Sequence, residues 1–273
     1  MPYRLSAFAD EISTDIQIQM DHLLENGVNL CTMRGANGKG VLDFEDFQVP
    51  LMKTQFYNRG IKFACIGSPI GKAKLSDPFE AELTRFKVAC KRAKQFETKV
   101  MRVFSFYLPE GDDPAKHKGE VIKRMKALAE HAKAEGINLL HENEVGIFGN
   151  TAGRCVELIE GVGAPNLMAA FDFANFAHEG DDPLAAWGKL KKWVKDFHIK
   201  DYSVSKKQTV PAGQGDGKLR EILGDAFKNN WAGLLTLEPH LDKTDGFKDM
   251  NGGQRFKAAA DALKGVLAEA GAK

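Results

Sequence analysis

Eight short apolar segments alternate with longer amphipathic segments along the chain, and no other feature limits the possible folds as strongly. We expect the apolar segments to be β-strands, at residues 3–8, 28–33, 61–66, 100–106, 137–141, 167–171, 194–199 and 233–237. Several are apolar on both faces, which is typical of parallel strands covered by helices. Eight strand–helix units in order predict an α/β fold, a closed (β/α)8 barrel, with a doubly wound open sheet as the alternative.

The segments between these strands carry apolar residues at helical spacing. In residues 114–135, Val121, Met125 and Leu128 fall on one face, while lysine and glutamate occupy the rest. Residues 80–96 repeat this pattern. Glycine is expected to end helices at Gly27, Gly60, Gly136 and Gly163, and the expected helix starts are Thr14, Asp77 and Asp182.

Length and composition agree with one globular barrel. The chain has 273 residues, close to the roughly 250 typical of this fold. It has no linker, low-complexity tract or change of composition, so residues 1–273 are expected to form a single (β/α)8 barrel domain. Hydrophobic residues make up 43% and charged residues 27%, as is ordinary for a globular domain. The formal net charge of +1 predicts that nucleic acid is not a partner.

The sequence also predicts no membrane association. No segment approaches the ~20 consecutive apolar residues of a membrane helix, and the first residues lack the apolar run of a signal peptide. The cysteines are scattered without a Cys-x-x-Cys pair, which indicates reduced thiols; they are Cys31, Cys65, Cys90 and Cys155. We therefore expect a cytoplasmic protein, and a homo-oligomer remains possible.

Four of the predicted strands end at a residue that can bind a metal. These residues are Glu142, Asp172, His198 and Glu238. They lie too far apart in the sequence for one loop or helix to collect them, but the strand ends of a barrel open on one face. Three carboxylates and one imidazole are ligands for a single divalent cation: Mn²⁺ or Mg²⁺ suits the oxygen-rich set, Mn²⁺ being the first expectation, and Co²⁺ or Zn²⁺ remains possible because of the histidine. Glu144 is the competitor of Glu142.

Short motifs follow most of the predicted strands. They are Phe-Ala-Asp-Glu-Ile-Ser at 8–13, Ser-Pro-Ile-Gly-Lys at 68–72, Glu-Asn-Glu at 142–144, Phe-Asp at 171–172, His-Ile-Lys-Asp at 198–201, Gly-Gln-Gly-Asp-Gly at 213–217 and Glu-Pro-His at 238–240. As an ordered set they resemble the xylose isomerase-like TIM barrel family, also called the sugar phosphate isomerase/epimerase superfamily. The resemblance covers nearly the whole chain and implies that Glu142, Asp172, His198 and Glu238 hold one divalent ion.

The resemblance further implies a reaction on a small-molecule carbohydrate, a keto-sugar or sugar phosphate. The cation polarises a carbonyl and stabilises the enediolate that forms when the adjacent carbon loses a proton. In epimerases of this family the two ligand glutamates take and return that proton, which implies catalytic roles for Glu142 and Glu238. Return of the proton gives epimerisation or isomerisation. Loss of a β-hydroxyl from the same enediolate would instead make the protein a lyase acting on a keto-sugar, keto-inositol or dehydroshikimate-like substrate.

Five further residues are weaker candidates for substrate binding, namely Arg34, Lys72, Arg102, Lys200 and His240. Arginine and lysine bind hydroxyls, carboxylates and phosphates. The alternative for the two arginines is a salt bridge at the barrel end, and for Lys72 a solvated loop position. Residues 213–217 could close over a ligand or form a simple turn.

The chain departs from the family pattern at two positions. Asn175 stands where many epimerases and the related endonucleases have a histidine, and Val204 stands where epimerases have a substrate-binding arginine. Ketohexose 3-epimerase specificity therefore does not carry over. The DNA-repair endonuclease branch requires a histidine-rich cluster of three zinc ions, so the loss of that histidine and the near-zero charge make it a remote alternative.

Overall fold

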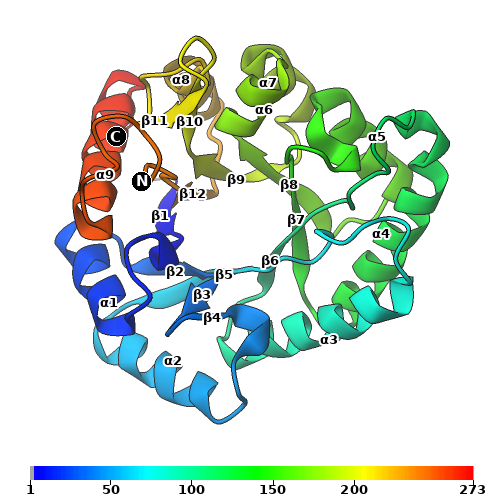
Figure 1. Ribbon diagram of the computed structural model, residues 1–273, viewed down its shortest axis with the longest axis horizontal. Coiled ribbons are helices and arrows are strands. Elements are labelled where there is room, and N and C mark those ends of the chain that lie inside the picture. The colour runs from blue at the N-terminus through cyan, green and yellow to red at the C-terminus, as the bar shows by residue number, and fades with distance from the viewer. Residues whose placement is uncertain (1–2, 273) are drawn as a thin grey trace.

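A computed structural model of the chain describes residues 3–272, and its centre is a closed barrel of parallel strands (Figure 1). Around the barrel the order is β1, β2, β5, β6, β7, β8, β9 and β12, which then pairs with β1 again. The strands are β1 (Arg4–Ala7), β2 (Leu30–Met33), β5 (Lys62–Gly67), β6 (Val100–Val103), β7 (Asn138–Glu142), β8 (Leu167–Asp172), β9 (Val194–Ile199) and β12 (Leu234–Leu237). The expected barrel is thus confirmed, and the open sheet is excluded.

Helices form a ring outside the barrel (Figure 1). They are α1 (Ile16–Glu25), α2 (Gln48–Asn58), α3 (Phe79–Gln95), α4 (Lys118–Ala134), α5 (Ala152–Val162), α6 (Phe173–Glu179), α7 (Pro183–Leu190), α8 (Leu219–Lys228) and α9 (Gly252–Glu269). Short 3-10 helices occur at η1 (Ala9–Glu11), η2 (Val41–Asp43), η3 (Pro114–Lys116) and η4 (Phe148–Asn150). Two hairpins follow barrel strands: β3 (Gly35–Ala36) with β4 (Lys39–Gly40), and β10 (Asp201–Ser203) with β11 (Gln208–Val210).

Each predicted strand overlaps a barrel strand, but the segment 100–106 is too long. The strand β6 ends at Val103, because the next residues leave the barrel and bind the loop after β5. Phe104 N donates to Ile70 O and Phe106 N donates to Gly71 O, both at 2.8 Å. Similarly, the predicted helix 114–135 begins as η3 and continues as α4.

The helix ends follow the predictions in part. All four predicted glycines have positive φ angles. Asp182 caps α7 by accepting a hydrogen bond from Leu184 N. Thr14 was the wrong cap for α1, since the Asp15 side chain accepts from Gln17 N and Ile18 N. Asp77 was also wrong: its carboxylate accepts from Lys74 N in the preceding turn, and α3 starts without a side-chain cap.

The core between strands and helices is rich in phenylalanine. On β8 and β9, Phe171 and Phe197 pack against Trp187 of α7 with ring centroids 6.3 and 5.4 Å away, respectively. Burial of a side chain of this size contributes roughly 1.5–3 kcal/mol. Because successive strand residues point to opposite faces, these outward phenylalanines turn Asp172 and His198 toward the barrel interior.

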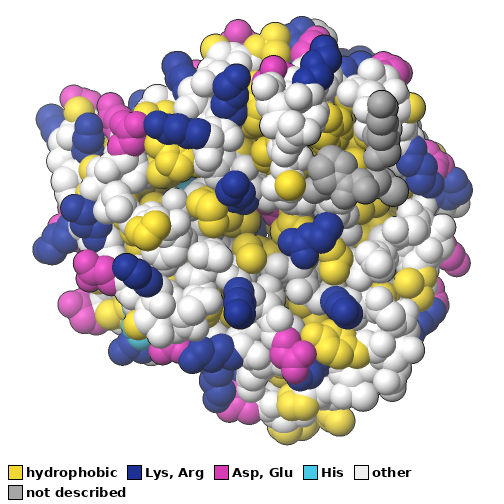
Figure 2. All heavy atoms as spheres, turned by 180° about the vertical axis from the view of Figure 1, so that it is seen from behind, with side chains coloured by type: hydrophobic (Ala, Val, Ile, Leu, Met, Phe, Trp, Pro, Cys, Tyr) yellow, Lys and Arg dark blue, Asp and Glu magenta, His cyan; other side chains and the backbone are white. Residues whose placement is uncertain are grey.

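Two further sequence expectations concern the thiols and the surface. Cys31, Cys65, Cys90 and Cys155 are all buried and free, as the reduced-thiol prediction requires. Within residues 3–272, no helix combines the length and the apolar character needed to cross a membrane. On the face turned to the viewer in Figure 2, lysine and arginine side chains are spread singly among hydrophobic and uncharged ones.

Candidate metal centre

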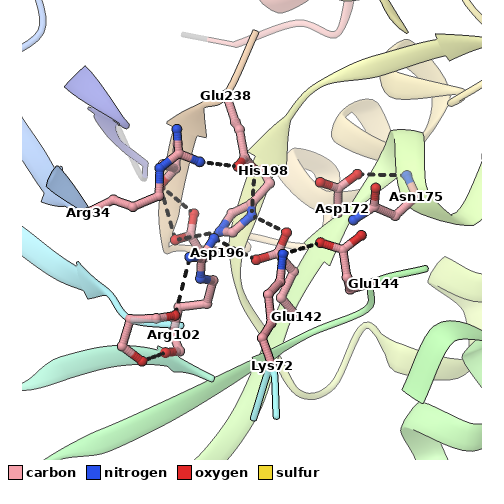
Figure 3. A network of polar contacts seen from close by, with 12 residues as sticks. Arg34, Lys72, Arg102, Glu142, Glu144, Asp172, Asn175, Asp196, His198 and Glu238 are labelled. Atoms are coloured by element: carbon pink, nitrogen blue, oxygen red, sulfur yellow. Dashed lines mark hydrogen bonds and ion pairs between the residues drawn. The ribbon is translucent and has the colours of Figure 1, made fainter. Parts of the chain in front are cut away.

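Glu142, Asp172, His198 and Glu238 come together at one end of the barrel (Figure 3). They come from the ends of β7 and β8, from β9, and from the position after β12. One ligand atom of each lies within 4.8 Å of those of the other three, and all four residues are buried. The barrel register explains this: Asp172 pairs with His198, and His198 pairs with Thr236, two residues before Glu238.

Two asparagines fix the position of Asp172. The Asn143 side chain accepts a hydrogen bond from Asp172 N at 2.9 Å and donates one to Asp172 O at 3.0 Å. Asn175 N donates to Asp172 Oδ1 at 2.8 Å, and the Asn175 side chain donates to Asn143 O at 2.9 Å. Asn175, at the position where the family resemblance implied a histidine, therefore orients the aspartate and leaves its Oδ2 atom facing the centre.

Asp196 lies beneath His198 inside the barrel. His198 Nε2 is 3.7 Å from Asp196 Oδ2, and Thr236 Oγ1 donates to the same carboxylate at 2.8 Å. With Nε2 directed at Asp196, the Nδ1 atom faces Glu142 and Glu238. The sequence interpretation missed Asp196. The period of two along a strand is the signal that could have found it, since Asp196 shares the inner face of β9 with His198.

Each glutamate is held by an arginine on its outer oxygen. Arg102 Nη1 donates to Glu142 Oε2 at 3.0 Å, and Arg34 Nη1 donates to Glu238 Oε1 at 2.9 Å. The ring of Phe8 lies 4.6 Å from the Arg34 guanidinium carbon and 5.0 Å from that of Arg102. Both glutamates thus keep their other carboxylate oxygen, Oε1 of Glu142 and Oε2 of Glu238, for the centre.

The remaining predicted residues lie around the same cluster. Lys200 is buried, with its ammonium 2.7 Å from Asp172 Oδ2 and 3.9 Å from Glu238 Oε2. His240 Nε2 is 3.0 Å from Glu11 Oε1 and 3.4 Å from Glu238 Oε1. Lys72 forms an ion pair with Glu144 at 2.7 Å, so Glu144 lies outside the ligand cluster.

Burial and charge shift the pKa values of this cluster. Burial raises the pKa of Asp172 to about 6, and Lys200 offsets only part of this effect. Burial alone would lower the pKa of His198, but Glu142 and Glu238 raise it well above its ordinary value. Burial acts to raise the pKa of Glu142, yet His198 and Arg102 outweigh it and lower the pKa to about 2. The positive charges of His198, Lys200 and Arg102 thus offset three carboxylates that would otherwise repel one another.

The donor set fits a divalent cation. Asp172 Oδ2, His198 Nδ1 and Glu238 Oε2 are buried atoms that form no aligned hydrogen bond, although the Lys200 ammonium makes an ion pair with Asp172 Oδ2 at 2.7 Å. His198 Nδ1 is 3.1 Å from Glu142 Oε1 and 3.2 Å from Glu238 Oε2, distances of ion pairs that lack hydrogen-bond alignment. Buried polar atoms are rarely left without a partner, and a cation coordinated by all four residues would supply one. The cluster is therefore a buried carboxylate–histidine site that could bind a metal.

A cavity of about 430 Å³ adjoins the cluster; we call it the inner cavity. It is lined by Arg34, Lys72, Arg102, Glu144, Glu238 and His240, and by Gly40–Asp43, Gly67, Pro69, Arg85 and Val88. Small-molecule sites commonly have volumes of about 300–1,000 Å³. The inner cavity is therefore large enough for a small molecule that contacts Glu238.

The glycine-rich loop 213–217 is held in place by the side chain of Asp201. The Asp201 carboxylate accepts hydrogen bonds from the backbone nitrogens of Gly213, Gly215 and Gly217, each at 2.9 Å. At Gly215, an added Cβ would lie 2.5 Å from Asp201 Oδ1, so this close approach requires glycine. These contacts favour a fixed turn over a loop that closes on a ligand.

Comparison with known proteins relates the chain to one family and to several enzymes. The family model described as xylose isomerase-like TIM barrel matches residues 21–266. A curated relative, 3-dehydroshikimate dehydratase from Bacillus anthracis, is 25% identical over 129 residues, which are 47% of this chain and 46% of the relative. That match thus spans about half the length of the curated relative.

Solved structures share the fold over nearly the full length. The probable 3-dehydroshikimate dehydratase AsbF of Bacillus anthracis has a TM-score of 0.77 at 18% identity, covering 97% of this chain and 99% of that one. L-ribulose 3-epimerase has a TM-score of 0.77 at 17% identity, covering 98% and 95%. IOLI protein, solved with a zinc atom, has a TM-score of 0.78 at 15% identity, covering 97% of this chain and 98% of that one.

Proposed function

The chain belongs to the xylose isomerase-like TIM barrel family, and on this premise we propose that it is a metal-dependent isomerase or epimerase of a small carbohydrate. The substrate would be a keto-sugar or sugar phosphate that loses a proton from carbon next to a carbonyl. The observation that carries the proposal is the buried cluster of Glu142, Asp172, His198 and Glu238 beside the inner cavity.

These four residues would hold one divalent ion. Three carboxylates and one imidazole favour Mn²⁺, with Mg²⁺, Co²⁺ and Zn²⁺ as competitors. When bound, the cation would supply polarisation of a carbonyl group and stabilisation of negative charge on its oxygen. Asn143 and Asn175 would orient Asp172, and Asp196 would orient His198, as residues behind metal ligands do in other proteins.

Glu142 and Glu238 are the proposed acid and base. They contact His198 Nδ1 with one oxygen each, at 3.1 and 3.2 Å, and approach it from two sides (Figure 3). Glu238 also lines the inner cavity, where it would meet the substrate. One carboxylate would take the proton from the carbon next to the carbonyl and the other would return it, which requires carboxylates on both sides of the substrate.

The charges of the inner cavity suit a substrate rich in hydroxyl groups. Its cationic side chains Arg34, Lys72, Arg85 and Arg102 each form an ion pair with a carboxylate of the protein. Hydroxyl groups bind well to such paired groups, because they both donate and accept hydrogen bonds. Lys200, whose ammonium is 2.7 Å from Asp172, would act in orienting the same centre.

A lyase is the second candidate. The relative at 25% identity is a dehydratase of 3-dehydroshikimate, and loss of a β-hydroxyl shares its first step with epimerisation. The endonuclease branch stays a remote alternative. Within the described residues, one other group of possible metal ligands exists, formed by Glu11, Glu238 and His240. The Arg34 guanidinium already bridges its two glutamates, at 3.2 Å from Glu11 and 2.9 Å from Glu238, so this group does not suit the further zinc ions of an endonuclease.

The test is metal analysis followed by a substrate panel in D₂O. We expect about one divalent ion per chain, and solvent deuterium in the carbon next to the carbonyl of a true substrate, as seen by NMR. An epimer or isomer as product would support the first candidate, and an unsaturated product the lyase. Turnover that persists after complete removal of metal by a chelator would contradict both.

A further inference from the structure

A second cavity, of about 840 Å³, lies beside the inner one, and we call it the outer cavity. Its walls come from the β10–β11 hairpin, the loop after β12 and the first turn of α9, which are neighbours at the barrel rim (Figure 1). Phe256, Pro239 and Leu241 are buried residues of its wall, while Tyr202 and Gln208 offer polar groups. The mechanism proposed above uses none of these residues.

The outer cavity carries positive charge that the protein itself does not neutralise. Lys206, Lys207 and Lys243 line it, and none of their ammonium groups forms an ion pair within residues 3–272. Arg255 also lines it and donates one hydrogen bond to Met250 O. The inner cavity differs in this respect, because its cationic side chains are all paired with carboxylates of the protein; they are Arg34, Lys72, Arg85, Arg102 and His240.

The acidic residues of the outer cavity do not remove this excess. Glu11 is the carboxylate nearest the metal cluster, and both of its oxygens are in use. Oε1 lies 3.2 Å from Arg34 and 3.0 Å from His240, and Oε2 accepts from His240 N at 2.8 Å. Asp242, an exposed residue, is the other acid of the lining.

Two lining residues adopt a backbone conformation that glycine or asparagine adopts more readily. Lys207 has a φ angle of 52° and His240 one of 48°. Non-glycine residues in the left-handed region are uncommon, and strain of this kind gathers at ligand sites. Lys207 belongs to the turn between β10 and β11, and its backbone conformation is part of the turn that brings two lysines to the cavity.

His240 connects the two cavities. It lines both of them, and its ring is 3.4 Å from Glu238 Oε1. A ligand in the outer cavity therefore lies one side chain away from a residue of the metal cluster. A group bound there could belong to the same molecule that reacts in the inner cavity, or to a separate one.

We propose that the outer cavity binds the phosphate group of a small molecule. A phosphate is a compact polyanion that lysine and arginine recognise by charge and by several hydrogen bonds. Lys206, Lys207, Lys243 and Arg255 would contact it, and the volume leaves room for the organic part of a phosphate ester. The site itself does not depend on the metal-dependent reaction proposed above.

The test is calorimetric titration of inorganic phosphate into the full chain after metal has been removed by a chelator. The combined variant Lys206→Gln, Lys207→Gln and Lys243→Gln should bind phosphate at least tenfold more weakly than the native chain. The control variant Lys87→Gln, Lys126→Gln and Lys133→Gln removes the same charge from exposed lysines of α3 and α4 and should change the affinity less than twofold. NMR signals of Gln208, Thr209 and Gly252 should shift on titration.

Absence of saturable binding to the native chain would overturn the proposal, as would an equal loss of affinity in both triple variants. A second arm identifies the source of the phosphate. If it belongs to the substrate, the cavity variant should raise KM for a phosphorylated sugar and leave KM for its unphosphorylated form unchanged. If both KM values stay unchanged while phosphate binding is lost, the ligand is a separate molecule. If the native chain turned over neither the phosphorylated nor the unphosphorylated sugars, the proposed function would be contradicted, but the calorimetric test of the phosphate site would still stand.

Discussion

Asn143 offers the sharpest test of how the candidate metal centre is built. Its buried side chain makes two hydrogen bonds to the backbone of Asp172, at 2.9 and 3.0 Å. Asn143→Ala leaves that buried N–H and C=O without their partner, at about 1–3 kcal/mol each, so the free energy of unfolding should fall by roughly 2–6 kcal/mol. Metal affinity should also fall about 10–100-fold, because Asp172 loses the contacts that orient it.

Asn166→Ala is the matched control for this variant. Asn166 is also buried, and its side chain donates to two backbone oxygens, Ala129 O at 2.9 Å and Ile137 O at 3.2 Å, away from the metal cluster. It should lose stability without losing metal affinity. Urea denaturation in chelator measures the first quantity and Mn²⁺ titration of the folded protein the second. Native metal affinity in Asn143→Ala, or an equal loss in both variants, would refute the reasoning.

Four further predictions follow from the same site. Asp172→Asn and Glu238→Gln should each weaken metal uptake by about 100-fold or more, roughly 2.8 kcal/mol, and elemental analysis at full occupancy in either would contradict the ligand set. The Glu238→Gln variant, reloaded with excess metal, should still show severely reduced turnover, since an amide cannot act as a carboxylate base; near-native turnover would show that Glu238 is not a catalytic residue. In chelator, the pKa of Asp172 is raised to about 6 in the folded protein. The protonated Asp172 therefore stabilises the fold below the ordinary pKa of aspartate, and this stabilisation is lost as the pH rises through about 6. Because metal displaces that proton, the gain in Tm on adding Mn²⁺ should grow from about pH 5 to about pH 7, and a gain independent of pH would contradict this. Finally, an abasic DNA duplex should not be cleaved at physiological salt, and metal-dependent cleavage that Asp172→Asn abolishes would favour the endonuclease branch.

Much of the fold could be read from the sequence because strand and helix periodicity is a local signal. The eight strands and the strand-end positions of Glu142 and Asp172 needed no tertiary information. The hairpins β3–β4 and β10–β11 were not predicted, since they are short and carry no alternating apolar pattern. Thr14 and Asp15 are both acceptable caps by type, and only the backbone conformation decides between them.

The partners of the site residues were harder to predict. Nothing in the local sequence marks Asn143 as a clamp for Asp172, because the two meet only when β7 and β8 lie side by side. The same holds for Arg34, which reaches Glu238 from the opposite end of the chain at 2.9 Å. The single domain of residues 1–273, a homo-oligomer, a cytoplasmic location and the preference for Mn²⁺ stay predictions.

The shared contact of Arg34 and Arg102 with the Phe8 ring has a consequence for how this site could change. Each arginine holds one of the two glutamates proposed as acid and base, and one aromatic ring supports both arginines, at 4.6 and 5.0 Å. The same ring meets His198 edge to face at 5.2 Å. The two sides of the site are therefore coupled through the side chain at residue 8. A substitution at residue 8 would act on both glutamates and the histidine at once, whereas independent adjustment of one side requires a change at its arginine.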